Sequence, residues 1–114
     1  MTDPTAARVA KNEATFRESN ERIRGAAAEY GLHDGLPFLC ECADPSCTQI
    51  IRMDAAAYER LRSNPRRFVN APGHERTAAP HVVVVEQHDC YEVVEKVGEA
   101  AEIVTELDPR GARR

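Results

Sequence analysis

The chain has 114 residues, of which 42% are hydrophobic and 30% are charged, and its net charge is −4. This length predicts one domain, and the composition is typical of a soluble globular protein. The acidic net charge argues against a nucleic-acid-binding protein with a basic surface throughout. No apolar stretch is long enough to span a bilayer, and the first residues lack the apolar core of a signal peptide. We therefore expect a cytoplasmic protein that does not contact membranes.

The first predicted element is a long helix. Residues 1–6 have the composition of a disordered lead-in, and a helical pattern follows over 7–30. An apolar residue recurs every seven positions of this helix, at Val9, Phe16, Ile23 and Tyr30. The stripe is narrow, which favours packing on the helix's own domain over a coiled-coil dimer.

The middle of the chain predicts two short strands and a helix. Residues 36–43 and 48–53 have strand composition and flank a tight turn at 44–46. Asp54 is a favourable N-cap for a helix that ends before Pro65.

The last part predicts a hairpin and a final helix. Residues 81–86 and 91–96 are rich in β-branched residues, and 67–69 form a short extended segment. The four consecutive valines of 81–86 favour a strand that is covered on both faces. A C-terminal helix is expected over 98–107, and 110–114 should form a flexible basic tail.

Three of the four cysteines lie close together, at Cys40, Cys42 and Cys47. Thiols stay reduced in the cytosol, so clustered cysteines favour metal ligation over disulfides. Tetrahedral zinc has Zn–S bonds of ~2.3 Å and needs sulfurs about 3.8 Å apart. In a flat strand the Cα atoms of Cys40 and Cys42 would lie roughly 6.6 Å apart. Binding of one ion by both therefore predicts a bend or bulge near Glu41.

The fourth ligand must come from elsewhere in the chain. His74 is favoured because the Pro72-Gly73 turn before it can present a side chain at an unusual angle. Cys90 is the main alternative, and His81 and His88 are further candidates. Either ligand set suits structural Zn²⁺, and an iron–sulfur cluster is a minor alternative. The sequence thus predicts one zinc-stabilised α+β domain over 7–109. It should contain a small antiparallel sheet, a long N-terminal helix, a middle helix and a C-terminal helix.

The pattern Cys40-Glu-Cys42-x4-Cys47 followed by Pro72-Gly73-His74-Glu75 resembles a family of small uncharacterised bacterial proteins. The resemblance spans roughly residues 11–109 and also rests on Phe16-Arg-Glu-Ser-Asn-Glu-Arg-Ile23, Tyr58-Glu59, Pro65-Arg-Arg-Phe68 and Val93-Val-Glu-Lys96. It implies that the three cysteines and His74 form one metal site. It implies no established activity.

A four-ligand zinc site leaves no position for a substrate, so we expect a structural ion in a protein-interaction or regulatory module with an unidentified partner. Residues 52–76 hold six arginines and three acidic residues. Four of these arginines are candidate partner-binding residues: Arg60, Arg62, Arg66 and Arg67. The oligomeric state stays open.

Three further functions are compatible with the sequence. A nucleic-acid or ribosome-associated factor would use the basic patch Arg52–Arg67 to bind phosphates. A thiol–zinc redox switch would release its metal on oxidation, with a disulfide between Cys40 and Cys42. An enzyme would need a base such as Glu41 or Glu75, but the sequence holds no HExxH motif and no Gly-rich phosphate loop. Catalysis is therefore not favoured.

Overall fold

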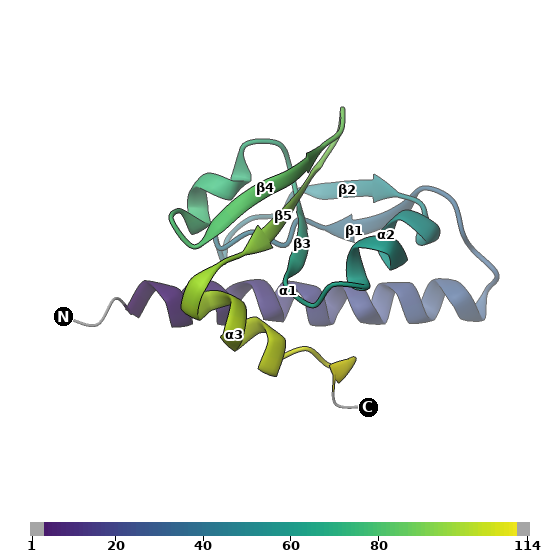
Figure 1. The fold of residues 1–114 in the computed structure, drawn as a ribbon. Coiled ribbons are helices and arrows are strands. Elements are labelled where there is room, and N and C mark those ends of the chain that lie inside the picture. The colour runs from purple at the N-terminus through teal and green to yellow at the C-terminus, as the bar shows by residue number, and fades with distance from the viewer. Residues whose placement is uncertain (1–3, 112–114) are drawn as a thin grey trace.

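The structure is a computed structural model that describes residues 4–111 (Figure 1). Its elements in chain order are α1 (Pro4–Glu29), β1 (Leu36–Leu39), β2 (Ile50–Met53), α2 (Ala55–Arg62), β3 (Arg67–Asn70), the 3-10 helix η1 (His74–Ala78), β4 (Val82–Gln87), β5 (Glu92–Lys96) and α3 (Gly98–Glu106). The predicted α+β class is confirmed. Of the expected lead-in, residues 1–3 lie outside the described residues, and α1 already begins at Pro4 because proline is tolerated in a first helical turn.

The strands form two antiparallel sheets instead of the single predicted sheet. β1 pairs with β2, and β5 lies between β3 and β4 in the second sheet. β5 is almost wholly buried, whereas Val83 and Val85 of the edge strand β4 are exposed. The prediction that the four-valine strand is covered on both faces is therefore wrong. The buried strand is β5, the next one along the chain. It is buried because it occupies the central position of its sheet, and a run of valines does not determine that position.

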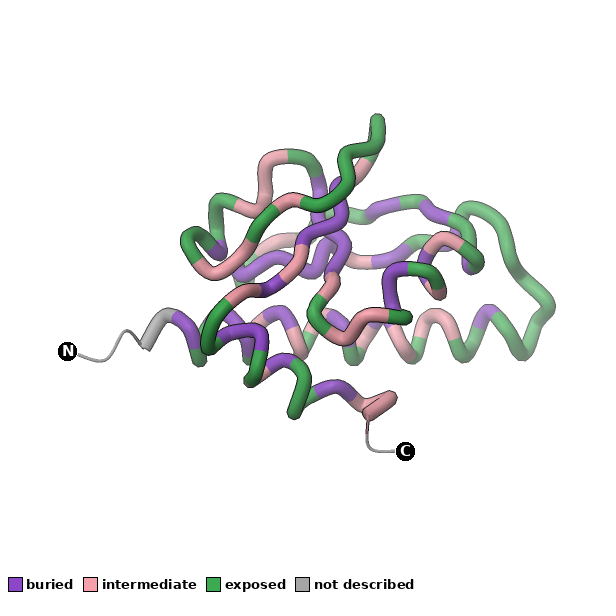
Figure 2. The backbone as a smooth tube through the Cα atoms, in the orientation of Figure 1, coloured by how far each residue is buried: buried purple, intermediate pink, exposed green. Residues whose placement is uncertain are grey.

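Helix α1 runs beneath both sheets and packs on α3 (Figure 1). The apolar stripe follows the buried face only in part, because Val9 is buried, Phe16 and Ile23 are half-buried and Tyr30 is 79% exposed. The positions of this helix that are 0% exposed are polar or small: Ala10, Glu13, Arg17 and Asn20. Figure 2 shows buried segments concentrated where the sheets face α1. The helix thus packs on its own domain, as predicted, but through a largely polar face.

Apolar packing surrounds this polar face. Phe38 of β1 stacks on Tyr58 of α2 with ring centroids 4.3 Å apart. Phe68 of β3 lies under the Arg17 guanidinium, whose carbon is 3.7 Å from the ring centroid. Arg17 also donates hydrogen bonds to the carbonyl oxygens of Pro65 and Arg67 at 2.6 and 2.8 Å. A buried cation is stable here because it meets both carbonyl acceptors and a π-system.

Arg62 does not contribute to a surface patch. It is 3% exposed and binds Asp108 through Nη2 at 2.6 Å and Glu21 through Nε at 3.0 Å. Its assignment as a partner-binding residue is therefore wrong, because its charge is satisfied inside the domain. Arg110, expected in the flexible tail, is anchored by ion pairs with Glu21 and Glu59. Residues 112–114 lie outside the described residues. Within 4–111, no helix has both the length and the apolar character required to cross a membrane.

Candidate metal centre

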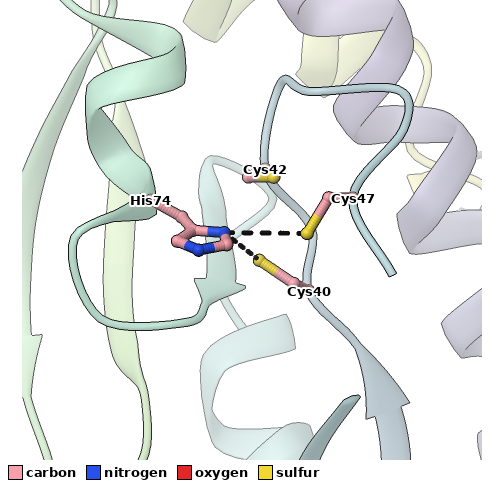
Figure 3. Close-up of side chains that lie close together, drawn as sticks. All are labelled: Cys40, Cys42, Cys47 and His74. Carbon is pink, nitrogen blue, oxygen red and sulfur yellow. Dashed lines mark hydrogen bonds between the residues drawn. The ribbon is translucent and has the colours of Figure 1, made fainter. Parts of the chain in front are cut away.

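The four predicted ligands converge on one point (Figure 3). The sulfurs of Cys40, Cys42 and Cys47 and a ring nitrogen of His74 all lie within 4.8 Å of one another. His74 Nδ1 is 3.5 Å from Cys40 Sγ and 3.6 Å from Cys47 Sγ. In a tetrahedral zinc site, Zn–S bonds of ~2.3 Å and Zn–N bonds of ~2.0 Å place sulfur and nitrogen about 3.5 Å apart. These two sulfur–nitrogen separations therefore match those of a tetrahedral site in which Nδ1 is a ligand.

The backbone changes partners between the first two ligands. The Cys40 N–H donates to the Gln49 carbonyl, next to β2, at 3.0 Å. The Glu41 N–H instead donates to the Val69 carbonyl of β3 at 2.7 Å. β1 accordingly ends at Leu39, earlier than predicted, and the segment beginning at Cys40 crosses from one sheet to the other. The change of hydrogen-bond partner falls at Glu41, the position near which the sequence predicts a bend or bulge.

The Glu41 side chain is fully buried between the ligands and α1. Its Oε1 accepts a hydrogen bond from Val69 N at 3.0 Å, and its Oε2 accepts one from Asn20 Nδ2 at 2.8 Å. Burial raises the pKa of Glu41, and the nearby Arg17 guanidinium opposes that rise. Both carboxylate oxygens are occupied, so Glu41 acts as a structural link between α1 and β3.

The predicted turn brings Cys47 back to the cluster. Asp44 Oδ1 accepts hydrogen bonds from the Ser46 N–H at 2.9 Å and the Ser46 hydroxyl at 2.7 Å. The Cys47 N–H then donates to the Asp44 carbonyl at 3.1 Å. An aspartate side chain that accepts a hydrogen bond from the backbone two residues further on commonly stabilises a tight turn.

His74 is positioned by contacts that the sequence does not indicate. It is the first residue of η1 and follows Gly73, whose φ of 86° is accessible mainly to glycine. The Glu92 carboxylate of β5 accepts the Gly73 and Glu75 N–H groups, each at 3.2 Å. A negative charge is favourable beside the free N–H groups at the start of a helical turn. Glu92 thus fixes the loop that carries the His74 imidazole. In the sequence, only the presence of an acidic residue within a valine-rich strand hints at this role.

Thr77 ties η1 to the cysteine segment. Its hydroxyl accepts a hydrogen bond from the Ala43 N–H at 3.0 Å and donates one to the His74 carbonyl at 2.8 Å. Asn12 of α1 donates to the Ala43 carbonyl at 3.1 Å. Hydrogen bonds within the protein therefore hold the cysteine segment close to the 3-10 helix that carries His74.

The surroundings of the three sulfurs favour a thiolate at Cys42 and a thiol at Cys40 and at Cys47. The Ala71 N–H donates to Cys40 Sγ at 3.1 Å. A hydrogen bond from the Cys40 thiol lowers the pKa of Cys42 to about 5 and raises the pKa of Cys40, while burial raises the pKa of Cys47. Metals bind thiolates, so a bound dication would displace the protons of Cys40 and Cys47. This donor set fits a divalent metal ion.

The structure does not bring the rival candidate ligands to the cluster. Cys90 is exposed at the end of the β4–β5 hairpin. His88 stacks on Tyr91 and pairs with Glu86, and His81 is half-buried outside the cluster. Cys40, Cys42, Cys47 and His74 are the one group of three or more metal-ligating side chains within residues 4–111.

No protein-family model, curated protein or solved structure matches the chain. The assignment of the site therefore rests on its own geometry.

Proposed function

We propose that this protein binds one Zn²⁺ through Cys40, Cys42, Cys47 and His74, and that the zinc-stabilised domain acts as a protein-interaction or regulatory module. The observation that carries the proposal is the pair of sulfur–nitrogen separations of 3.5 and 3.6 Å in a group of three sulfurs and one imidazole. Three thiolates and one imidazole suit zinc because it prefers tetrahedral sulfur and nitrogen ligands.

A structural role is supported by where the ligands lie. They come from the end of β1, the following turn and the start of η1, so one ion connects segments that are distant in sequence. The chain is poor in aromatic residues, which make up 5% of it, and alanine supplies much of its apolar content. In such a domain the binding free energy of a metal contributes directly to folding.

The contacts of the nearby acids do not favour catalysis. Four protein ligands leave no position for a substrate or an activated water. Both Glu41 oxygens accept hydrogen bonds, from Asn20 and from Val69, so neither is free to take a proton from a substrate. A hydrogen bond with Glu92 lowers the pKa of Glu75, and a carboxylate with a lowered pKa is a weaker general base.

A phosphate-binding surface and a redox switch receive less support. Of the arginines of the basic patch Arg52–Arg67, Arg62 is buried and Arg67 is paired with Glu95 at 3.0 Å, which leaves Arg52, Arg60 and Arg66 exposed. Few free cations weigh against binding of a nucleic acid. A redox switch requires an oxidant to reach Cys40 and Cys42, which are 1% and 0% exposed.

The metal content of the purified, reduced protein tests the proposal. We expect about one zinc per chain by mass spectrometry, and a large fall in thermal stability after removal by a strong chelator. A chain without stoichiometric metal that folds equally well under chelation would contradict it. For the module, immobilised zinc-loaded protein should retain a specific partner that an apo sample does not retain.

A further inference from the structure

A cavity of about 420 Å³ lies between α2 and the hairpin formed by β4 and β5, away from the four metal ligands. Its volume is in the range of small-molecule binding sites. Met53, Leu61 and Val93 give it an apolar floor, and all three are buried in the core of the domain. The floor is therefore held by the fold itself.

Two rings form one side of this cavity. His88 and Tyr91 stack with centroids 4.4 Å apart and an interplanar angle of 22°. His88 Nε2 lies 2.9 Å from Glu86 Oε1, which restrains the imidazole. Burial and the Glu86 carboxylate raise the pKa of Tyr91, and Arg60 acts in the opposite direction. Flat aromatic groups over an apolar floor favour planar ligands.

The two arginines that line the cavity differ in whether an acidic side chain pairs with them. Arg67 is engaged by Glu95 at 3.0 Å and lies 3.9 Å from Glu86. Arg60 also lines the cavity, and it has no ion-pair partner among residues 6–111. The cavity thus combines an apolar floor, an aromatic side and one guanidinium with free donors.

We propose that this cavity binds a small molecule made of a planar ring and a carboxylate. The ring lies over Met53 and Val93 beside Tyr91, and the carboxylate accepts hydrogen bonds from Arg60. A guanidinium recognises a carboxylate through paired, charge-assisted hydrogen bonds. A nucleic acid fits less well, because it requires several phosphate contacts and this site offers one free cation.

A nuclear magnetic resonance titration of the zinc-loaded, ¹⁵N-labelled full-length chain tests the inference. The probes are indole-3-acetate, which carries ring and carboxylate, and tryptamine, which carries the same ring with a positive charge. Indole-3-acetate should produce saturable shifts at the amides of Ala57, Arg60, Tyr91 and Val93, and tryptamine should not. Shifts that do not saturate, that arise elsewhere, or that tryptamine reproduces would overturn the inference.

Two variants that each remove one positive charge distinguish specific binding at Arg60 from general electrostatic attraction of the ligand to the protein. Arg60→Gln should weaken binding of indole-3-acetate by about tenfold, as expected for loss of a hydrogen-bonded charge. Arg66→Gln removes an exposed charge that does not line the cavity, and should leave the affinity unchanged. An equal effect of both variants would overturn the inference. The zinc content of each variant, measured in parallel, shows whether the domain is intact and keeps this test separate from that of the metal centre.

Discussion

Asn20 Nδ2 lies 2.8 Å from Glu41 Oε2, and both side chains are fully buried. The same amide also pairs with the backbone of Leu39, donating to its carbonyl at 2.9 Å and accepting its N–H at 2.8 Å. Asn20 therefore takes the place of a neighbouring strand at the end of β1, directly before the first metal ligand. One side chain of α1 therefore holds the backbone of Leu39 and the carboxylate of Glu41, the residues on either side of Cys40.

Removal of this amide should loosen the cysteine segment. Asn20→Ala leaves the Leu39 backbone groups and a Glu41 oxygen without a partner, so we expect a loss of about 3 kcal/mol in the free energy of unfolding. Urea denaturation of the zinc-loaded protein measures it. Glu18→Ala, at an exposed position of the same helix, is the control and should change stability by less than about 0.5 kcal/mol. A similar result for both variants would show that Asn20 does not support the site.

Substitution of the ligands should give a clear ranking. Cys42→Ser, Cys47→Ser and His74→Ala should each lose zinc to a chromogenic chelator far more readily than the unmodified chain. A structural zinc contributes on the order of 10 kcal/mol to small metallo-domains, so Cys47→Ser should also unfold much of the domain. Cys90→Ser removes an exposed thiol outside the cluster and should retain zinc normally. Equal zinc loss from Cys90→Ser and His74→Ala would contradict the ligand assignment.

Glu92 should affect metal affinity although it is not a ligand. Glu92→Gln retains one carbonyl oxygen for the Gly73 and Glu75 N–H groups that the carboxylate now binds with two. Substitution of a residue that supports a metal ligand typically weakens metal affinity by about 10- to 100-fold, so we expect weaker zinc binding in Glu92→Gln. Competition with a chelator of known affinity measures the change, and Glu99→Gln at an exposed position of α3 is the matched control. An unchanged zinc affinity in Glu92→Gln would show that the loop holds His74 without this carboxylate.

The Glu13 carboxyl should make stability depend on pH. Burial raises its pKa from 4.5 to about 7, the Lys96 ammonium 2.5 Å away opposes the rise, and Glu41 and Cys42 add to it. Because the folded state holds this proton more tightly than the unfolded state, the contribution of Glu13 is full below pH 4.5 and is lost as the pH rises through 7. In Glu13→Gln this loss is absent. The difference in unfolding free energy between the two proteins should therefore change by about 3 kcal/mol between about pH 5 and 8.

Zinc-saturated samples of both proteins, unfolded in urea over that pH range, measure this difference. Parallel stability profiles would show that Glu13 keeps an ordinary pKa in the folded state.

Local features of the site could be predicted from the sequence. The cysteine trio lies within one short segment around a turn, and the Pro72-Gly73 turn marks His74 without knowledge of the fold. Asn20 and Glu92 could not be found in this way. Their roles depend on which backbone groups the fold places opposite them, and neither residue has a local motif.

The fold could be predicted at the level of its elements. Helix and strand positions follow from periodicity, which is why the α+β class is confirmed. The buried face of α1 could be predicted only in part, because apolar spacing does not reveal that Glu13 and Arg17 find buried partners in Lys96 and Asp108. The order of β4 and β5 also depends on tertiary pairing, which valine content does not encode.

The position of the ligands along the chain has a consequence for synthesis on the ribosome. All four have emerged once residue 74 leaves the exit tunnel, whereas the central strand β5 and helix α3 follow later in the chain and emerge after them. Metal capture by the nascent chain can therefore precede completion of the second sheet. The coordinated segment then offers β3 as a ready edge, on which β5 can pair when it arrives.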